Sequence, residues 1–271
     1  RGAPSAVLTV TADNKTRGYG VANPALTATL SGFIAGDNAG NSTTGSAALT
    51  TTATIASPVG SYPITVAIGS LASANYTFGT FTNGTLTITA APLVVTADNK
   101  SRVFGAANPA FTFTVTGFTN GEGTSVLTGS PTMTTTATAT SAPGNYPITI
   151  TAGTLANSNY TFSFVNGTLT VSQAATTTVI TNAAALAANA TPVGQAYAVN
   201  WSVTPVAPGA GTPTGTVLVS DGANTCSAAV GTGTCSLTST TVGAKTITAV
   251  YSGDANFAGS SATAATHTVV I

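Results

Sequence analysis

Charge is the scarcest property of this chain. Of its 271 residues, six are Lys or Arg and six are Asp or Glu, so charged residues make up 4% and the formal net charge is zero. An ordinary soluble domain carries roughly 25% charged residues. Nucleic acid and anionic membrane surfaces are recognised by clustered Lys and Arg, so neither is expected as a partner. Hydroxyl and amide side chains must supply the solubility that charges usually provide.

Long apolar runs are also missing. Runs such as PLVV at 92–95 and VVI at the end of the chain are far shorter than the roughly 18 apolar residues that a membrane-spanning helix needs. The hydrophobic share of 43% comes mainly from Ala and Val, diluted everywhere by Thr, Ser, Asn and Gly. We therefore expect no membrane span in this chain.

Residues that usually carry catalysis or bind metals are few. The one His, His267, has no G-x-S-x-G nucleophile motif to act with, and we interpret it as a strand-face residue. The six acids are spread along the chain, which disfavours a carboxylate pair for glycoside hydrolysis. Asp221 and Asp254 stand alone in their loops, and calcium prefers several oxygen ligands, so turn formation is favoured over a calcium site. We expect no enzymatic activity, no metal and no cofactor.

One long sequence motif nevertheless occurs twice. VTADNKTRGYGVANPAL at 10–26 returns as VTADNKSRVFGAANPAF at 95–111, and TTTAT, YPIT, NYTF and NGTLT also recur in the same order. The offset falls from 85 to 84 to 83 residues, which predicts one-residue deletions in the GDNAGNSTTG loop and near Gly79. Such ordered self-similarity is the signature of tandem repeats.

The repeats set the predicted domain organisation. We assign residues 6–90 to repeat 1 and 91–173 to repeat 2, with a linker at 1–5. Within each repeat, apolar and hydroxyl residues alternate in segments such as LTVTA and TLTIT, which predicts half-buried strands. The loop after SGF or TGF has room for one helical turn.

Residues 174–271 follow a different pattern. About seven short strands, separated by Gly- and Pro-rich links, are typical of an antiparallel sandwich. Trp201 lies in the middle of the second of these strands, and we predict that it and Tyr251 are core residues. The predicted fold class is therefore all-β, with three small domains in tandem.

Eight of the twelve charged residues form a duplicated set of four. The set is Asp13, Lys15, Arg17 and Asp37 in repeat 1, and Asp98, Lys100, Arg102 and Glu122 in repeat 2. We predict that Asp13 and Asp98 organise the end of the first strand by bonding to the backbone, as Asp does in turns. The Lys and Arg would be solvated or paired with the acid of the following GD or GE loop.

A second interpretation of the same residues is a covalent cross-link. Some surface fibres join a first-strand Lys to a last-strand Asn with the help of an acid. The pairs here would be Lys15 with Asn83 and Lys100 with Asn166, with Asp37 and Glu122 as the acids. This chemistry needs an apolar pocket that lowers the pKa of the Lys, and the DNKTR and DNKSR surroundings are too polar to favour it.

The two cysteines stand in CSAAVGTGTC. Two ligands without a nearby His are too few for zinc. A hairpin turning near Val230 would bring Cys226 opposite Cys235, within reach of a disulfide. Such a bond would stabilise the domain by about 2–3 kcal/mol and would indicate an oxidising compartment. The alternative is a pair of buried free thiols.

The repeated motifs resemble a known family. The order ADNK(T/S)R, (Y/F)G, ANPA, YPIT, NYTF and NGTLT, over residues 6–173, resembles the MBG repeats of the Tyr-Gly type, although Phe104 replaces the usual Tyr. Residues 174–271 resemble bacterial Ig-like repeats through GTPTGTV, SDG, the two cysteines and YSGDANFAGS. The resemblance implies two β-grasp-like domains, one Ig-like sandwich, and a place in large secreted bacterial adhesins.

The function favoured by these observations is structural. The chain would be an extracellular stalk or fibre segment at a bacterial cell surface, with other copies or neighbouring domains of the same surface protein as partners. One alternative is a module that binds a glycan or another cell-surface ligand through tyrosines such as Tyr62 and Tyr146. Another is a fibre subunit that polymerises by β-strand addition, with THTVVI at 266–271 as the donor strand.

Overall fold

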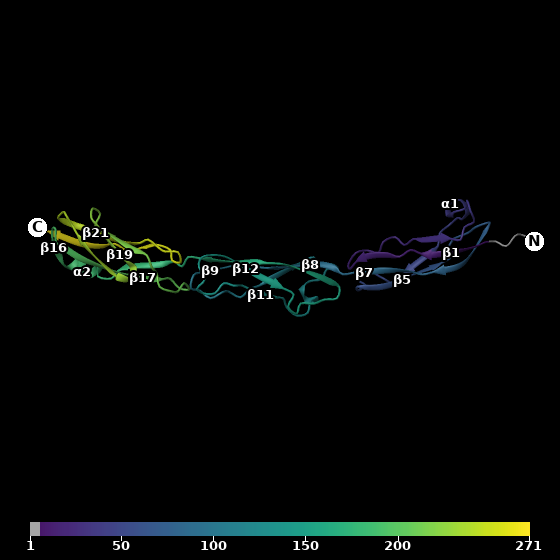
Figure 1. The fold of residues 1–271 in the computed structure, drawn as a ribbon, viewed down its shortest axis with the longest axis horizontal. Coiled ribbons are helices and arrows are strands. Elements are labelled where there is room, and N and C mark those ends of the chain that lie inside the picture. Colours follow the sequence, from purple (N-terminus) through teal and green to yellow (C-terminus); the bar gives the residue numbers. More distant parts are fainter. Residues whose placement is uncertain (1–5) are drawn as a thin grey trace, which may run out of the picture. The chain divides into compact units, whose positions relative to one another are not determined.

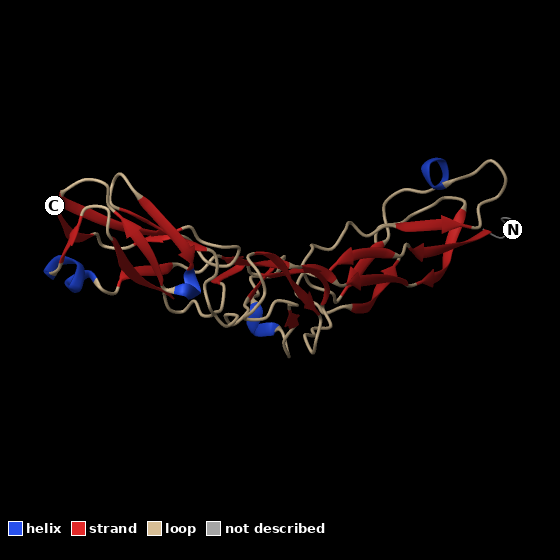
Figure 2. Cartoon of the chain, turned by 60° about the vertical axis from the view of Figure 1, so that its left-hand side comes forward, coloured by secondary structure: helices blue, strands red, loops and turns tan. Residues whose placement is uncertain are grey.

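The computed structural model describes residues 6–271, and strands dominate it (Figures 1 and 2). The fold is all-β and built of small tandem domains, as predicted. The predicted linker at 1–5 lies outside the described residues. Those residues form two compact units, and each unit receives one sheet of repeat 2. No helix within 6–271 is long and apolar enough to cross a membrane.

Repeat 1 folds into two sheets of the first unit, in the strand orders β3-β1-β6 and β2-β7-β5-β4. The strands are β1 (Ala6–Ala12), β2 (Lys15–Gly18), β3 (Ala28–Ser31), β4 (Ala48–Thr51), β5 (Gly60–Ala67), β6 (Tyr76–Thr82) and β7 (Gly84–Thr89). β1 runs parallel to β6, and β2 runs parallel to β7. Because side chains alternate between faces, Leu8 and Val10 of β1 are fully buried.

The two predicted length differences both appear in the structure. The pairing of β1 with β6 shifts register between Leu8 and Thr9 and passes over Gly79, which is the extra residue of a β-bulge. The extra residue of the loop lies near α1 (Ala39–Ser42), a single turn capped by the side chain of Asn38. This helix buries no residue, so α1 does not cover either sheet of repeat 1.

Repeat 2 has the same strand plan. Its sheet β10-β8-β13 lies in the first unit and its sheet β11-β12-β14-β9 lies largely in the second. The elements are β8 (Ala91–Ala97), β9 (Lys100–Val103), β10 (Phe113–Thr116), η1 (Thr124–Val126), β11 (Thr132–Thr134), β12 (Gly144–Thr151), β13 (Tyr160–Val165) and β14 (Gly167–Ser172). The parallel pairs β8 with β13 and β9 with β14 repeat those of repeat 1.

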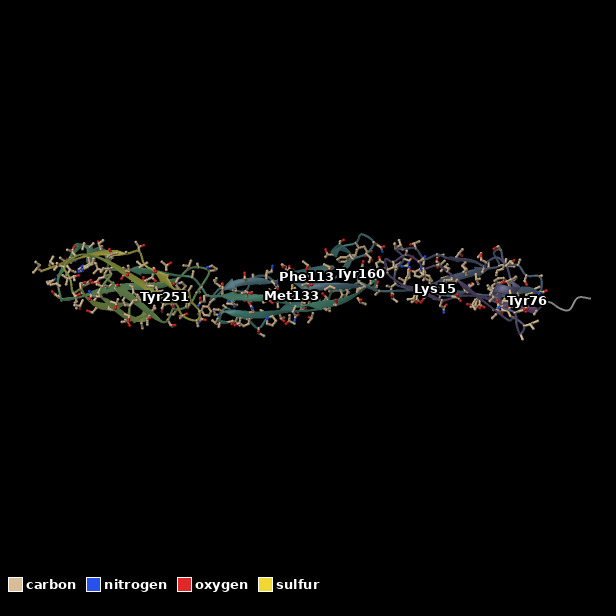
Figure 3. The ribbon with its side chains drawn as sticks, turned by 90° about the horizontal axis from the view of Figure 1, so that it is seen from above. Lys15, Tyr76, Phe113, Met133, Tyr160 and Tyr251 are labelled. Carbon is tan, nitrogen blue, oxygen red and sulfur yellow. A yellow bond between two sulfur atoms is a disulfide. The ribbon has the colours of Figure 1, made fainter. Side chains whose placement is uncertain are left out.

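The last domain is a sandwich in the second unit, with sheets β15-β17-β20 and β16-β23-β21-β18-β19 and with β22 beside β21. Its elements are β15 (Thr176–Ile180), α2 (Ala183–Ala188), β16 (Ala190–Pro192), β17 (Ala196–Pro205), β18 (Thr216–Ser220), β19 (Thr225–Ala229), η2 (Val230–Thr232), β20 (Thr234–Thr238), β21 (Gly243–Tyr251), β22 (Ser260–Ser261) and β23 (Ala265–Val270). Trp201 and Tyr251 are both buried in its core, and Figure 3 labels Tyr251.

Candidate functional site

The first candidate site is the end of repeat 1 that meets repeat 2, within the first compact unit. β2 stops at Gly18, and the N–H of Tyr19 donates to the carbonyl of Thr89 at 2.8 Å, so the aromatic ring is held directly beyond the sheet. Gly20 then turns the chain with a φ of 76°, in the left-handed region that favours glycine. We call Tyr19 and Gly20 the Tyr pole.

The hydroxyl of the Tyr pole is bound by an acid of the next repeat. Tyr19 donates to Oε1 of Glu122 at 2.6 Å, and Tyr160 donates to Oε2 of the same carboxylate at 2.5 Å. The two tyrosine rings meet edge to face, with centroids 5.4 Å apart, a favourable arrangement. The hydrogen bond to Glu122, followed by burial, raises the pKa of Tyr19. One carboxylate thus joins a phenol from each repeat.

The backbone around the Tyr pole is also close to repeat 2. A Cβ on Gly20 would lie 2.3 Å from Oγ1 of Thr119, so a side chain at this position would collide. Nearby, the N–H of Val59 donates to Oδ1 of Asn159 at 3.0 Å. Two glycine requirements, a positive φ and a close approach, therefore coincide at Gly20.

The corresponding end of repeat 2 meets the sandwich domain within the second unit. Phe104 stands in the place of Tyr19, and its N–H donates to the carbonyl of Ser172 at 2.8 Å. Its ring meets Phe257 edge to face at 5.3 Å. A Cβ on Gly105, whose φ is 81°, would lie 2.1 Å from the carbonyl oxygen of Ala210. We call Phe104 and Gly105 the Phe pole.

A buried arginine supports each pole. Arg17 and Arg102 are 5% and 8% exposed. Arg17 donates to Oδ1 of Asn23 at 2.7 Å, and its remaining nitrogens donate to the carbonyls of Gly18 and Thr54. Arg102 makes the matching contacts. The prediction that these arginines are solvated or paired with an acid was wrong, because the fixed fork of guanidinium donors is satisfied by an amide and carbonyls.

The aspartates of the repeated phrase bond to hydroxyls. Thr27 and Thr29 donate to the carboxylate of Asp13 at 2.5 and 2.7 Å and hold its pKa below the ordinary value. Thr112 donates in the same way to Asp98.

The backbone bonds predicted for these aspartates come from their neighbours. Asn14 accepts the N–H of Thr85, and Asn99 accepts the N–H of Thr168, both at 2.8 Å. Each asparagine thus ties the turn after its strand to the last strand of the repeat. The predicted turn role therefore belongs to Asn14 and Asn99.

In repeat 1, the acid and the lysine considered for a covalent cross-link are not brought together. Asp37 binds Tyr76, which pairs with the first residue of β1, whereas Lys15 opens β2, three residues after β1 ends at Ala12. Asn83 accepts the N–H of Val66 instead. The acid and the lysine therefore lie at opposite ends of one strand.

The disulfide joins two sheets. Cys226 and Cys235 are bonded, with Cα atoms 6.0 Å apart. β19 pairs with β18, and β20 pairs with β17 in the other sheet. The predicted hairpin pairing was therefore wrong: η2 and Gly233, with a φ of 71°, carry the chain from one sheet to the other, and the bond closes that arch.

Asp254 forms a turn that positions Phe257. It accepts the N–H groups of Asn256 and Phe257 at 2.7 and 2.8 Å, and Thr214 donates its N–H and hydroxyl to the other carboxylate oxygen. Burial works against ionisation, but these hydrogen bonds prevail and lower the pKa of Asp254 to about 2. The turn therefore holds the ring that receives the Phe pole.

Asp221 forms a second, buried turn. Burial again opposes ionisation, but bonds from Ser239, Asn224 and Ala223 hold its pKa well below the usual range. Ser239 also bonds the hydroxyl of Tyr197 at 2.9 Å. Among residues 6–271, no group of three or more His, Cys, Asp or Glu side chains could hold a metal ion.

The remaining residues named from the sequence are held by local contacts. His267 is buried in β23, with Nδ1 2.9 Å from the carbonyl oxygen of Leu186 and its ring against Tyr197. The hydroxyls of Tyr62 and Tyr146 donate to the carbonyls of Pro58 and Ala142, four residues earlier in each case. Each hydroxyl therefore already donates its proton within its own repeat.

Comparison with known proteins gives the same order of domains that the sequence resemblance predicted. The family model described as MBG domain (YGX type) matches residues 8–87 and 93–170. The model described as bacterial Ig-like domain (group 3) matches residues 184–270. A crystal structure of a tandem segment of titin is 12% identical over 97% of this chain and 99% of that chain. Its TM-score is 0.23, so we draw no structural conclusion from this similarity. No curated protein matches the chain.

Proposed function

Because the chain belongs to the family of MBG domains of the YGX type and carries a bacterial Ig-like domain after its two repeats, we propose that it is a structural segment of a bacterial surface adhesin. It would act outside the cell as part of a stalk or fibre, and it would have no catalytic activity. Its partners would be neighbouring domains or other copies of the same surface protein.

The observation that carries this proposal is the use made of the two poles. In each repeat, the aromatic residue and the glycine after it pack on the domain that follows, through Glu122 at the Tyr pole and Phe257 at the Phe pole. Gly20 and Gly105, the glycines of the repeated motif that have the closest neighbours, therefore lie where one domain contacts the next. A protein whose recurring motif joins domains fits a spacer or fibre.

The disulfide supports the extracellular part of the proposal. A bond between Cys226 and Cys235 is stable in oxidising compartments and rare in the cytosol. The shortage of charge fits the same setting, because few surface interactions of this chain would be screened by salt.

The two alternatives have less support. For strand addition, β23 would have to be free, but it pairs with β21 and β16 in its own domain and buries His267. For glycan binding, Tyr62 and Tyr146 are half-buried and their hydroxyls are engaged within their own repeat.

The test is electron microscopy of native cells labelled with gold-conjugated antibodies against residues 6–90 and against 174–271. The proposal expects both labels outside the cell, on strands continuous with a larger polypeptide. Regular filaments with one label per repeat, lost when Thr266–Ile271 is deleted from a chain that still folds, would favour the polymerising subunit instead. Binding to a glycan array that is lost in Tyr62→Ala would favour the binding module.

A further inference from the structure

We infer that the start of repeat 1 is a socket for the tyrosine of another MBG repeat, built as repeat 2 is built to receive Tyr19. This inference rests on the proposed structural function and names the partner that the start of repeat 1 would take. It concerns the residues at which β1 and β6 begin.

The socket residues of repeat 1 are already in the occupied arrangement. Phe33, Asp37 and Tyr76 correspond to Phe118, Glu122 and Tyr160 of repeat 2. Tyr76 donates to Oδ2 of Asp37 at 2.5 Å, the same distance as in the Tyr160–Glu122 pair. The ring of Phe33 meets Tyr76 edge to face at 5.4 Å, and the equivalent rings of repeat 2 are 5.7 Å apart.

The carboxylate is fixed in the same way in both repeats. The hydroxyl of Tyr76 accepts the N–H of Ile34 at 3.0 Å, as the hydroxyl of Tyr160 accepts the N–H of Thr119 at 3.2 Å. Figure 3 labels both tyrosines. Because each tyrosine is held at its own oxygen by a backbone donor, its proton is directed to the acid, and the other carboxylate oxygen stays available.

The occupant is the part that differs. In repeat 2, the second oxygen of Glu122 accepts the hydroxyl of Tyr19 at 2.6 Å. Within residues 6–271, the second oxygen of Asp37 accepts no hydrogen bond, and Asp37 is exposed. Ile34 stands where Thr119 faces Gly20, and it is 63% exposed. Asp37 and Ile34 of repeat 1 are thus uncovered, whereas the equivalent residues of repeat 2, Glu122 and Thr119, contact Tyr19 and Gly20.

The occupant must carry a tyrosine followed by glycine. The Phe pole has no hydroxyl to offer, and the Tyr pole of this chain is already bound to Glu122. The partner is therefore a further MBG repeat with a tyrosine at the position of Tyr19. Asp37 is one methylene shorter than Glu122. To reach its carboxylate, the incoming tyrosine would have to lie about one bond length closer to the backbone of repeat 1, where its ring would contact Ile34.

The experiment uses the full chain extended by a second copy of residues 6–90 placed ahead of residue 6. Spin labels are placed at exposed positions on either side of each junction. Pulsed electron paramagnetic resonance then measures how widely the distance between the two domains varies. We expect the new junction to give a narrow distance distribution, comparable to that of the junction between Tyr19 and Glu122. Tyr→Phe at the pole of the added copy, which leaves the socket untouched, should raise its undocked population about ten-fold.

Two further variants make the outcomes separable. Asp37→Ala should broaden the new junction alone, and Glu122→Ala should broaden the original junction alone. A broad new junction beside a narrow original one would overturn the socket and leave the proposed function standing. If the original junction is also broad and insensitive to Glu122→Ala, the pole packing that supports the proposed function fails as well.

Discussion

The Tyr pole and the Phe pole share a backbone and differ in chemistry. Both follow a buried arginine, both place an aromatic ring directly after a strand, and both continue with a glycine of positive φ. The Tyr pole ends on the carboxylate of Glu122, whereas the Phe pole ends on the ring of Phe257. The difference teaches that every repeat places an aromatic ring at the same point of its backbone. Whether that ring carries a hydroxyl depends on the next domain, which offers a carboxylate to Tyr19 and an aromatic ring to Phe104.

Removing the arginine should give the largest effect, and it tests what the poles share. Arg102→Met leaves the Asn108 side chain and the carbonyls of Val103 and Thr138 without their donor, so we expect a loss of about 3–5 kcal/mol in the free energy of unfolding. Arg17→Met should cost a similar amount. Arg102→Lys keeps the charge without the fork and should recover only a part; full recovery in denaturant titrations would contradict the contact set described above.

The glycine of a pole comes next. Gly105→Ala should be destabilising by about 1–2 kcal/mol through left-handed strain and by about 1–3 kcal/mol more through collision with Ala210. Gly194→Ala is the matched control, because its φ is 79° and no atom lies within 4 Å of the added Cβ. Equal losses of thermal stability in the two variants would show that the close approach at the Phe pole has no energetic weight.

Exchanging the two rings tests the match between pole and partner. Tyr19→Phe removes a hydrogen bond to a carboxylate, and we expect a loss of about 1.5 kcal/mol. Phe104→Tyr adds a hydroxyl where Phe257 offers no acceptor, so no stabilisation should follow. Calorimetric unfolding measures the stability of both variants. A gain of stability in Phe104→Tyr would contradict the proposed match between each ring and the domain that it contacts.

The smallest effects should be those of pH, and they should have opposite signs at the two poles. The pKa of Asp254 is lowered from 3.8 to about 2, so the stability it gives to the turn of Phe257 is present above 3.8 and is lost as the pH falls toward 2. The pKa of Tyr19 is raised from 10.0, so its contribution is complete below 10.0 and is lost at higher pH. Melting curves at acid, neutral and alkaline pH measure both.

The control variants for the pH experiment remove one group each. Asp254→Asn should remove the part of the acid sensitivity of the last domain that comes from Asp254, while Asp221, whose pKa is also lowered, retains its own part. Tyr19→Phe should reduce the alkaline sensitivity of the first unit. An acid sensitivity that is unchanged in Asp254→Asn would contradict the role of Asp254, and Asp221 would be the next residue to replace.

The sequence predicted the repeats, the strands and a length difference of one residue near Gly79, because these depend on local alternation and on a motif that occurs twice; that the extra residue forms a β-bulge came from the structure. It did not predict the Tyr pole, since Tyr19 and Glu122 are 103 residues apart and nothing local pairs them. The burial of Arg17 was missed for a related reason: its acceptors assemble only when three segments fold together. The one available signal was the asparagine six residues after each arginine.

The disulfide shows the same limit. The spacing of the cysteines was enough to predict a bond, but it could not distinguish two strands of one hairpin from an arch between sheets. That choice depends on which neighbours β19 and β20 take, and those neighbours are β18 and β17.

The parallel pairing inside repeat 1 has a mechanical consequence. A pull on the chain draws β2 toward the start of the repeat and β7 toward its end, and these two strands lie parallel and hydrogen-bonded from Lys15 to Gly18. Tension therefore loads the bonds of this ladder together, in shear, and cannot open them one at a time as a zipper opens. A repeat built this way should resist extension until the whole ladder gives way at once.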